Sequence, residues 1–196
     1  MIIGIDGNEA NIRNRVGVGR YAYELLWQFY KVQSSKLKVK SFNIYLKDKP
    51  LDNLPKETEW WKYKIVGPRK LWTQVGFLIN LFFDKPQPDV FFTPSHYAPR
   101  FCPCPSVISV MDLSYLKYPE LFKPNDLWQL KNWTEYSVKK AQKILTISNS
   151  SKNDIIKYYG IREDKVSVTY PGFNKEIKII NNINSIKKNL NYCFGF

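Results

Sequence analysis

The first thirty residues constrain the fold of this chain more than any other stretch. A β-branched apolar run, Ile2–Asp6, begins at the second residue, and a polar loop over residues 7–16 leads to the glycine turn Gly17-Val18-Gly19. Apolar residues then recur with the spacing of one helix face, at Ala22, Leu25, Leu26 and Phe29. A strand, a glycine turn and a helix in this order predict the beginning of an α/β fold with parallel strands.

Arginine is concentrated around this glycine turn. The chain is rich in lysine, yet three of its arginines, Arg13, Arg15 and Arg20, lie within eight residues of one another. A guanidinium offers a planar pair of donors that fits a phosphate or a carboxylate, which an ammonium does not. Glycines also let the backbone approach an anion at a helix start. We therefore predict an anion-binding loop that includes Gly17 and Gly19, with a solvated basic loop as the alternative.

The rest of the chain alternates between strand and helix patterns. Strands are predicted at residues 38–46, 60–66, 89–92, 106–110, 143–147 and 165–169, and helices at residues 70–83, 125–141 and 155–159. The last helix is expected to begin with a capping box of Ser151 and Asp154 and to stop at Gly160. This alternation predicts a Rossmann-like, doubly wound parallel sheet. The domain is expected to cover residues 1–173, and the Asn-, Ile- and Lys-rich residues 174–196 are expected to form a linker.

The predicted helix at residues 70–83 is apolar nearly all round. A crossover helix packed on the sheet is the favoured interpretation, and contact with a membrane interface is the alternative. The apolar stretch is too short to span a bilayer.

The formal net charge of +13 admits several anionic partners. The lysines are scattered singly and no basic–aromatic recognition motif occurs, so we expect no nucleic-acid partner. A generally basic solvated surface is the simplest interpretation, and attraction to an anionic membrane face or an acidic substrate is the alternative. The three cysteines and the single histidine lack zinc-site spacing, so we expect no metal site and a cytoplasmic protein, with the inner face of the membrane as a further location.

A candidate site follows the predicted strand at residues 106–110. Met111 and Asp112 stand at its carboxyl end, where open α/β sheets bind their ligands. Asp112 is predicted to act in catalysis or to hold a sugar hydroxyl, and a helix-capping or loop-bracing role is the alternative. The only histidine, His96, lies in the proline-rich loop at residues 93–105.

Four segments, in order along the chain, resemble the N-terminal domain of family-4 retaining glycosyltransferases of the GT-B fold. They are residues 17–21 (GVGRY), 107–120 (VISVMDLSYLKYPE), 144–151 (ILTISNSS) and 165–172 (KVSVTYPG). The resemblance implies one of the two domains of a GT-B enzyme, which binds a glycan or lipid-linked acceptor. It also implies transfer of a sugar from a nucleotide-sugar donor, which is a substrate, with no cofactor and no obligatory metal. Gly17, Gly19 and Arg20 would face the donor phosphates.

The chain departs from the family pattern in two ways. The residue before Asp112 is usually a histidine at the reaction centre, but here it is Met111, whose thioether cannot donate a hydrogen bond. His96, on a neighbouring loop of the expected acceptor cleft, is the candidate replacement. The family's paired glutamates eight positions apart are also missing, and only 24 residues follow Gly172, whereas a domain needs about 150.

These departures predict an acceptor-binding half that is inactive alone and needs a donor-binding domain on a missing or separate polypeptide. Residues 174–196 could then hold no more than the start of that domain. The alternative is a standalone Rossmann-like module that binds anionic glycans or lipid phosphates.

Overall fold

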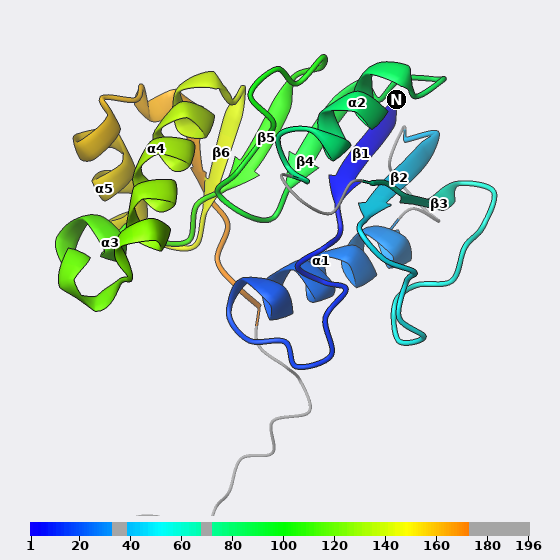
Figure 1. The fold of residues 1–196 in the computed structure, drawn as a ribbon, viewed down its shortest axis with the longest axis horizontal. Coiled ribbons are helices and arrows are strands. Elements are labelled where there is room, and N and C mark those ends of the chain that lie inside the picture. The colour runs from blue at the N-terminus through cyan, green and yellow to red at the C-terminus, as the bar shows by residue number, and fades with distance from the viewer. Residues whose placement is uncertain (33–38, 68–71, 173–196) are drawn as a thin grey trace, which may run out of the picture.

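A computed structural model describes residues 1–32, 39–67 and 72–172, which form one seven-stranded sheet in the order β3-β2-β1-β4-β5-β6-β7. Every pair of neighbouring strands is parallel. The strands are β1 (Ile2–Asp6), β2 (Ser41–Leu46), β3 (Trp61–Ile65), β4 (Val90–Thr93), β5 (Ser106–Ser109), β6 (Lys143–Thr146) and β7 (Val166–Val168). The predicted doubly wound parallel sheet is confirmed, and β1 lies in its interior (Figure 1).

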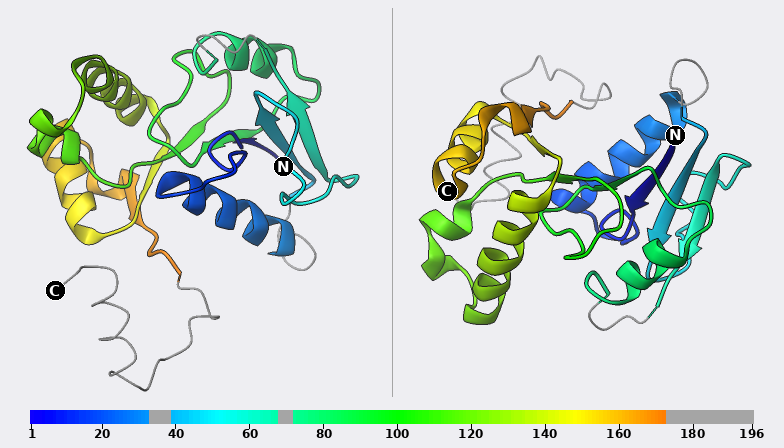
Figure 2. Two further views of the ribbon diagram at one scale, coloured as in Figure 1. Left: turned by 60° about the horizontal axis from the view of Figure 1, so that its bottom comes forward. Right: turned by 90° about the horizontal axis from the view of Figure 1, so that it is seen from above.

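Helices cover both faces of this sheet. They are α1 (Val18–Val32), α2 (Gly76–Phe83), α3 (Ser114–Lys117), α4 (Pro124–Lys140) and α5 (Asn149–Tyr159), with short 3-10 turns at Pro119–Leu121 and Glu163–Lys165. Figure 2 shows α1 and α2 on opposite sides of the sheet. The hydrophobic core is divided in the same way, because α1 packs over β1, β2 and β3, whereas α2, α4 and α5 bury the other face.

The strands are buried because both faces of the sheet are covered, as is typical of parallel sheets. On the α1 side, Phe42 of β2 stacks with Phe29 of α1 at a ring-centroid distance of 5.8 Å and contacts Trp61 of β3 at 5.3 Å. Phe42 and Trp61 are fully buried. The apolar residues that alternate along β2 therefore supply both halves of the core.

The helix predicted at residues 70–83 begins only at Gly76, so its predicted start is wrong. Residues 72–75 form a turn, and residues 68–71 lie outside the described ranges. The indole Nε1 of Trp72 donates to the carbonyl of Val66 at 3.0 Å, and its ring stacks on Phe77 at 4.6 Å. These tertiary contacts hold Trp72 in the core and delay the start of the helix.

The capping box predicted for the last helix is also wrong. Helix α5 begins at Asn149, and Ser148 is its N-cap, because the Ser148 hydroxyl accepts from the Ser151 amide at 3.1 Å. Asp154 instead forms an ion pair with Lys117 of α3 at 2.6 Å. The predicted stop is confirmed, since Gly160 is the C-cap in a left-handed conformation.

Residues 174–196, predicted to be a linker, lie outside the described residues, so that prediction stands as it was made. Within the described residues, no helix is both long and apolar enough to cross a membrane.

Candidate functional site

Four strands end in buried polar residues at the same edge of the sheet. They are Asp6 of β1, Thr93 of β4, Ser109 of β5 and Thr146 of β6. All strands run in parallel, so these residues share the carboxyl edge where ligands bind in open α/β sheets. The hydroxyls of Ser109 and Thr146 are buried and have no hydrogen-bond partner among the described residues. Unpaired buried hydroxyls are costly, which makes this edge a candidate for ligand contact.

Asp6 is the most strongly perturbed acid at this edge. Its carboxylate accepts from the backbone and side-chain nitrogens of Asn8 at 3.1 and 3.0 Å, and the Thr93 hydroxyl donates to it at 3.5 Å. Thr93 in turn lies 3.1 Å from the Ser95 hydroxyl. Burial raises the pKa of Asp6 to about 6, a shift that the hydrogen bonds from Asn8 oppose.

His96 lies on the loop after β4, directly after the hydrogen-bonded residues Thr93 and Ser95. Its Nε2 atom is buried and has no hydrogen-bond partner among the described residues, although the side chain as a whole is partly exposed. The imidazole contacts the Tyr97 ring edge-on at a centroid distance of 4.1 Å. Burial lowers the pKa of His96 to about 4, and the nearby charge of Asp112 opposes that shift. The imidazole is therefore neutral at physiological pH.

The structure brings two predicted site residues, His96 and Asp112, within electrostatic reach of each other. Asp112 is exposed just beyond β5, and one of its carboxylate oxygens accepts from the Ser114 amide at 2.8 Å. This contact braces the turn into α3, which is the structural role considered above. The second oxygen has no partner among the described residues and remains open to a ligand. Met111 is partly buried between β5 and Asp112.

The sequence analysis missed Asp6, Thr93, Ser95 and Tyr97. Tyr97 packs edge-on against Trp133 of α4 at a centroid distance of 5.5 Å, and burial raises its pKa. Asp6 could have been found from the sequence, because it stands at the carboxyl end of the first predicted strand, just as Asp112 follows a later strand. The other three lie at or beyond the end of β4, where only the order of strands reveals their neighbours.

The two glycines of the predicted anion-binding loop are required by different structural constraints. Gly17 has a φ of 49°, which an L side chain adopts only with strain. Gly19 is buried in the first turn of α1, and a Cβ there would lie 3.0 Å from the Glu9 carbonyl oxygen and 3.1 Å from Ile12 Cδ1. Gly19 thus allows α1 to pack closely on the preceding loop.

The three arginines near these glycines differ in the contacts that their guanidiniums make. Arg15 donates from Nε to the Ala10 carbonyl at 2.6 Å and from Nη2 to Asn53 Oδ1 at 2.8 Å. Its guanidinium also lies 4.2 Å from the centroid of the Tyr23 ring. Arg20 forms an exposed ion pair with Glu24 of α1 at 2.6 Å.

Arg13 is the remaining arginine of this loop. It is exposed and has neither a hydrogen bond nor an ion pair with the described part of the chain. Of the three guanidiniums, that of Arg13 is the one fully available to an anion.

A cavity of about 190 Å³ lies away from this edge, near the amino end of β5, and contains none of the predicted site residues. Its lining includes Arg100, Cys102, Cys104, Ser106, Tyr136 and Lys140. The thiols of Cys102 and Cys104 lie 3.8 Å apart. Among the described residues, no three His, Cys, Asp or Glu side chains are grouped to hold a metal ion. The carboxyl edge is the stronger candidate for a binding site, because three of the unpaired buried polar atoms of the described residues lie there, on His96, Ser109 and Thr146.

Comparisons with known proteins identify the family of this chain. The model of Glycosyltransferase Family 4 matches residues 16–177, which include His96, Met111 and Asp112. A comparison with curated proteins finds no match.

Solved structures of Anabaena Alr3699/HepE, in complex with UDP-glucose and with UDP, each match with a TM-score of 0.54 at 14% and 15% identity. Each match covers 99% of this chain, but only 49% and 50% of the two solved chains. This chain therefore spans about half of their length. By this family match, the chain belongs to glycosyltransferase family 4 and folds as the Rossmann-like N-terminal domain of a GT-B enzyme.

Proposed function

We propose that this chain provides the acceptor-binding domain of a nucleotide-sugar-dependent, retaining glycosyltransferase of polysaccharide assembly. The observation that carries the proposal is the neutral imidazole of His96, whose buried Nε2 atom lacks a partner within the described residues, beside Asp112. Membership of the family supports transferase chemistry. The acceptor would be a glycan or a lipid-linked sugar, bound at the carboxyl edge of the sheet.

The side chains at this edge have complementary chemistry for sugar hydroxyls. The open carboxylate oxygen of Asp112 accepts a hydrogen bond from a hydroxyl, and a neutral imidazole both donates and accepts. His96 would fulfil the role that the thioether of Met111 cannot perform. In this proposal, Asp112 binds and orients the acceptor hydroxyl, while His96 contacts the reacting sugars.

The donor would be held mainly by a second domain, on a longer or a separate polypeptide. The solved structures of Alr3699/HepE contain UDP-glucose or UDP, which supports a nucleotide-sugar donor here by analogy. Its phosphates would approach the loop of Gly17 and Gly19, with Arg13 as the available cation. The donor is a substrate, and the proposal includes no cofactor. The chain by itself would transfer no sugar.

A glycan-binding experiment tests this proposal. The 196-residue chain is applied to an array of oligosaccharides and lipid-linked sugars, and its hits are titrated by NMR together with UDP-glucose. We expect binding to an acceptor glycan that Asp112→Asn and His96→Gln each weaken about tenfold, as the loss of one hydrogen bond to a charged or buried group predicts. Asp52→Asn, a change on an exposed loop, is the matched control. Absence of any glycan binding, or binding that survives both site changes, would overturn the proposal.

One observation favours a second candidate function. The guanidinium of Arg13, exposed and without a partner among the residues that the structure describes, also suits a standalone module for anionic glycans or lipid phosphates. That module predicts binding that weakens with salt and is lost in Arg13→Ala but retained in Asp112→Asn. The same titrations therefore separate the two functions.

A further inference from the structure

Helix α2 exposes a continuous row of large apolar side chains. Val75 at its N-cap is 38% exposed, Ile79 48%, Phe82 52% and Phe83 78%. At 100° per residue, these positions fall within an arc of about 100° on one side of the helix, and together they are here called the α2 stripe. Neither Phe82 nor Phe83 makes a ring–ring contact with the described residues.

The opposite face of α2 is already committed to the core. Phe77 and Leu81 are fully buried there, and Phe77 packs against Tyr45 and Phe91 at ring-centroid distances of 4.9 and 4.8 Å. The helix is thus apolar nearly all round, although only one face has a partner within the described chain. Scattered apolar residues are normal at a protein surface, whereas a row along one helix marks an interaction surface.

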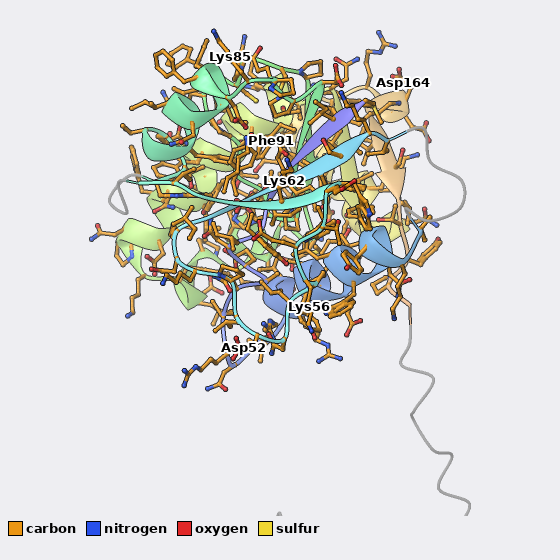
Figure 3. All side chains as sticks on the ribbon, turned by 90° about the vertical axis from the view of Figure 1, so that its right-hand side faces the viewer. Asp52, Lys56, Lys62, Lys85, Phe91 and Asp164 are labelled. Carbon is orange, nitrogen blue, oxygen red and sulfur yellow. The ribbon has the colours of Figure 1, made fainter. Side chains whose placement is uncertain are left out.

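Two exposed lysines lie near the α2 stripe. Lys85 directly follows the C-cap residue of α2 and is exposed. Lys62 is exposed on the neighbouring edge strand β3, on the same face of the sheet as Lys64, which pairs with Asp84. Figure 3 labels Lys62 on β3 and Lys85 at the end of α2. The nearest acid of the helix, Asp84, is neutralised by its ion pair, so this surface keeps a positive charge.

We propose that the α2 stripe docks on an anionic lipid bilayer, with α2 lying in the plane of the headgroups. Phe82 and Phe83 would enter the boundary between headgroups and acyl chains, and Lys62 and Lys85 would contact lipid phosphates. The two exposed lysines and the net charge of +13 favour this occupant over a second copy of the same basic chain, which would repel it. The inference concerns a surface on α2 and does not depend on the proposed acceptor site.

Vesicle sedimentation tests this surface. The full chain is mixed with vesicles of phosphatidylcholine alone, or of phosphatidylcholine and phosphatidylglycerol in equal parts. We expect binding to the anionic vesicles that the double change Phe82→Ser and Phe83→Ser lowers about tenfold or more, because each phenyl ring loses favourable transfer from water. Replacing Lys62 and Lys85 with Gln should remove the preference for phosphatidylglycerol while leaving the weaker binding to phosphatidylcholine.

A matched control uses exposed aromatic residues elsewhere. Tyr158 on α5 is 45% exposed and Tyr170 is 69% exposed, and changing both to Ser should leave vesicle binding unchanged. Circular dichroism checks that each variant is folded, and Phe83→Ser alone, at the most exposed position of the stripe, provides a milder second variant. Equal binding by both Phe variants and the wild-type chain would overturn the proposal. So would a dimer in sedimentation that the Phe variants convert to monomer without any vesicle binding by the wild-type chain.

Discussion

The replacement of Asp6 by Asn should reveal a pH dependence of stability that the wild-type protein conceals. Burial raises the pKa of Asp6 from 3.8 to about 6, so the folded protein holds a proton there that the unfolded chain has lost. Where the folded state binds more protons, the free energy of unfolding falls as pH rises. At 1.36 kcal/mol per pKa unit, this carboxyl lowers the free energy of unfolding by about 3 kcal/mol between about pH 4 and about pH 6.

His96 acts with the opposite sign over nearly the same range. Burial lowers its pKa from 6.5 to about 4, so the unfolded chain binds the proton first as pH falls. The free energy of unfolding therefore rises by up to about 3 kcal/mol as pH increases from about 4 to 6.5. In the wild-type protein, the contributions of Asp6 and His96 nearly cancel.

Urea unfolding, measured at intervals between about pH 4 and about pH 7, separates these two contributions. Asp6→Asn keeps an oxygen that can accept from Asn8 but cannot ionise, so its free energy of unfolding should rise across the range by about 3 kcal/mol. His96→Gln should show a fall of similar size, and the double variant should again be nearly flat. Asp52→Asn, on an exposed loop, should match the wild-type profile. Flat profiles for both single variants would refute this account of the carboxyl edge.

Three further predictions concern packing, capping and thiol chemistry. Gly19→Ala should lower the free energy of unfolding by about 1–3 kcal/mol, because its Cβ would meet a backbone carbonyl at 3.0 Å. Ser148→Ala removes the N-cap bond to Ser151 and should cost about 1 kcal/mol in the same denaturant assay. Cys102 and Cys104, with sulfurs 3.8 Å apart, should bind a trivalent arsenical in a one-to-one complex that mass spectrometry detects.

Matched variants give each of these predictions a control. Gly67 has no atom within 4 Å of an added Cβ, so Gly67→Ala should leave the denaturation midpoint nearly unchanged. Ser150→Ala lies in the same serine-rich turn but not at the N-cap, and an equal loss from it would contradict the assigned cap. Cys102→Ser should abolish the tight arsenical complex, and its persistence would show that the two thiols do not act together.

The strands of the sheet were predicted well because each one is marked by a local pattern of apolar residues in the sequence. β1 and β2 are short apolar runs whose identity depends on neighbouring residues, and both were found. The start of α2 was missed because Trp72 is fixed by a contact with Val66, which no local pattern contains. The cap of α5 was missed because Ser148, Ser150 and Ser151 are chemically equivalent in sequence, and only backbone geometry selects one of them.

Only the part of the candidate site that directly follows a predicted strand could be found from the sequence. Asp112 was found by its position after β5, but its neighbourhood with His96 depends on the course of the loop after β4. That loop contains no regular structure whose period could be read, so the burial of His96 Nε2 follows from tertiary packing alone. The same limit applies to Asp6 and Thr93, which are 87 residues apart and meet because β1 and β4 are neighbours.

The arginine cluster shows why closeness in sequence is weaker evidence than the geometry of each side chain. Arg15 lies in the middle of the cluster, yet two of its donors bind Ala10 and Asn53 and its face covers Tyr23, so it ties three segments of the protein together. A lysine lacks the two separate nitrogens of the planar guanidinium that reach Ala10 and Asn53, which explains an arginine there without any ligand. The case for an anion at this loop therefore rests on Arg13 together with the first turn of α1. Because that case is independent of Arg15, loss of anion binding in an Arg15 variant would report a disturbed fold, whereas loss in an Arg13 variant would report a lost contact.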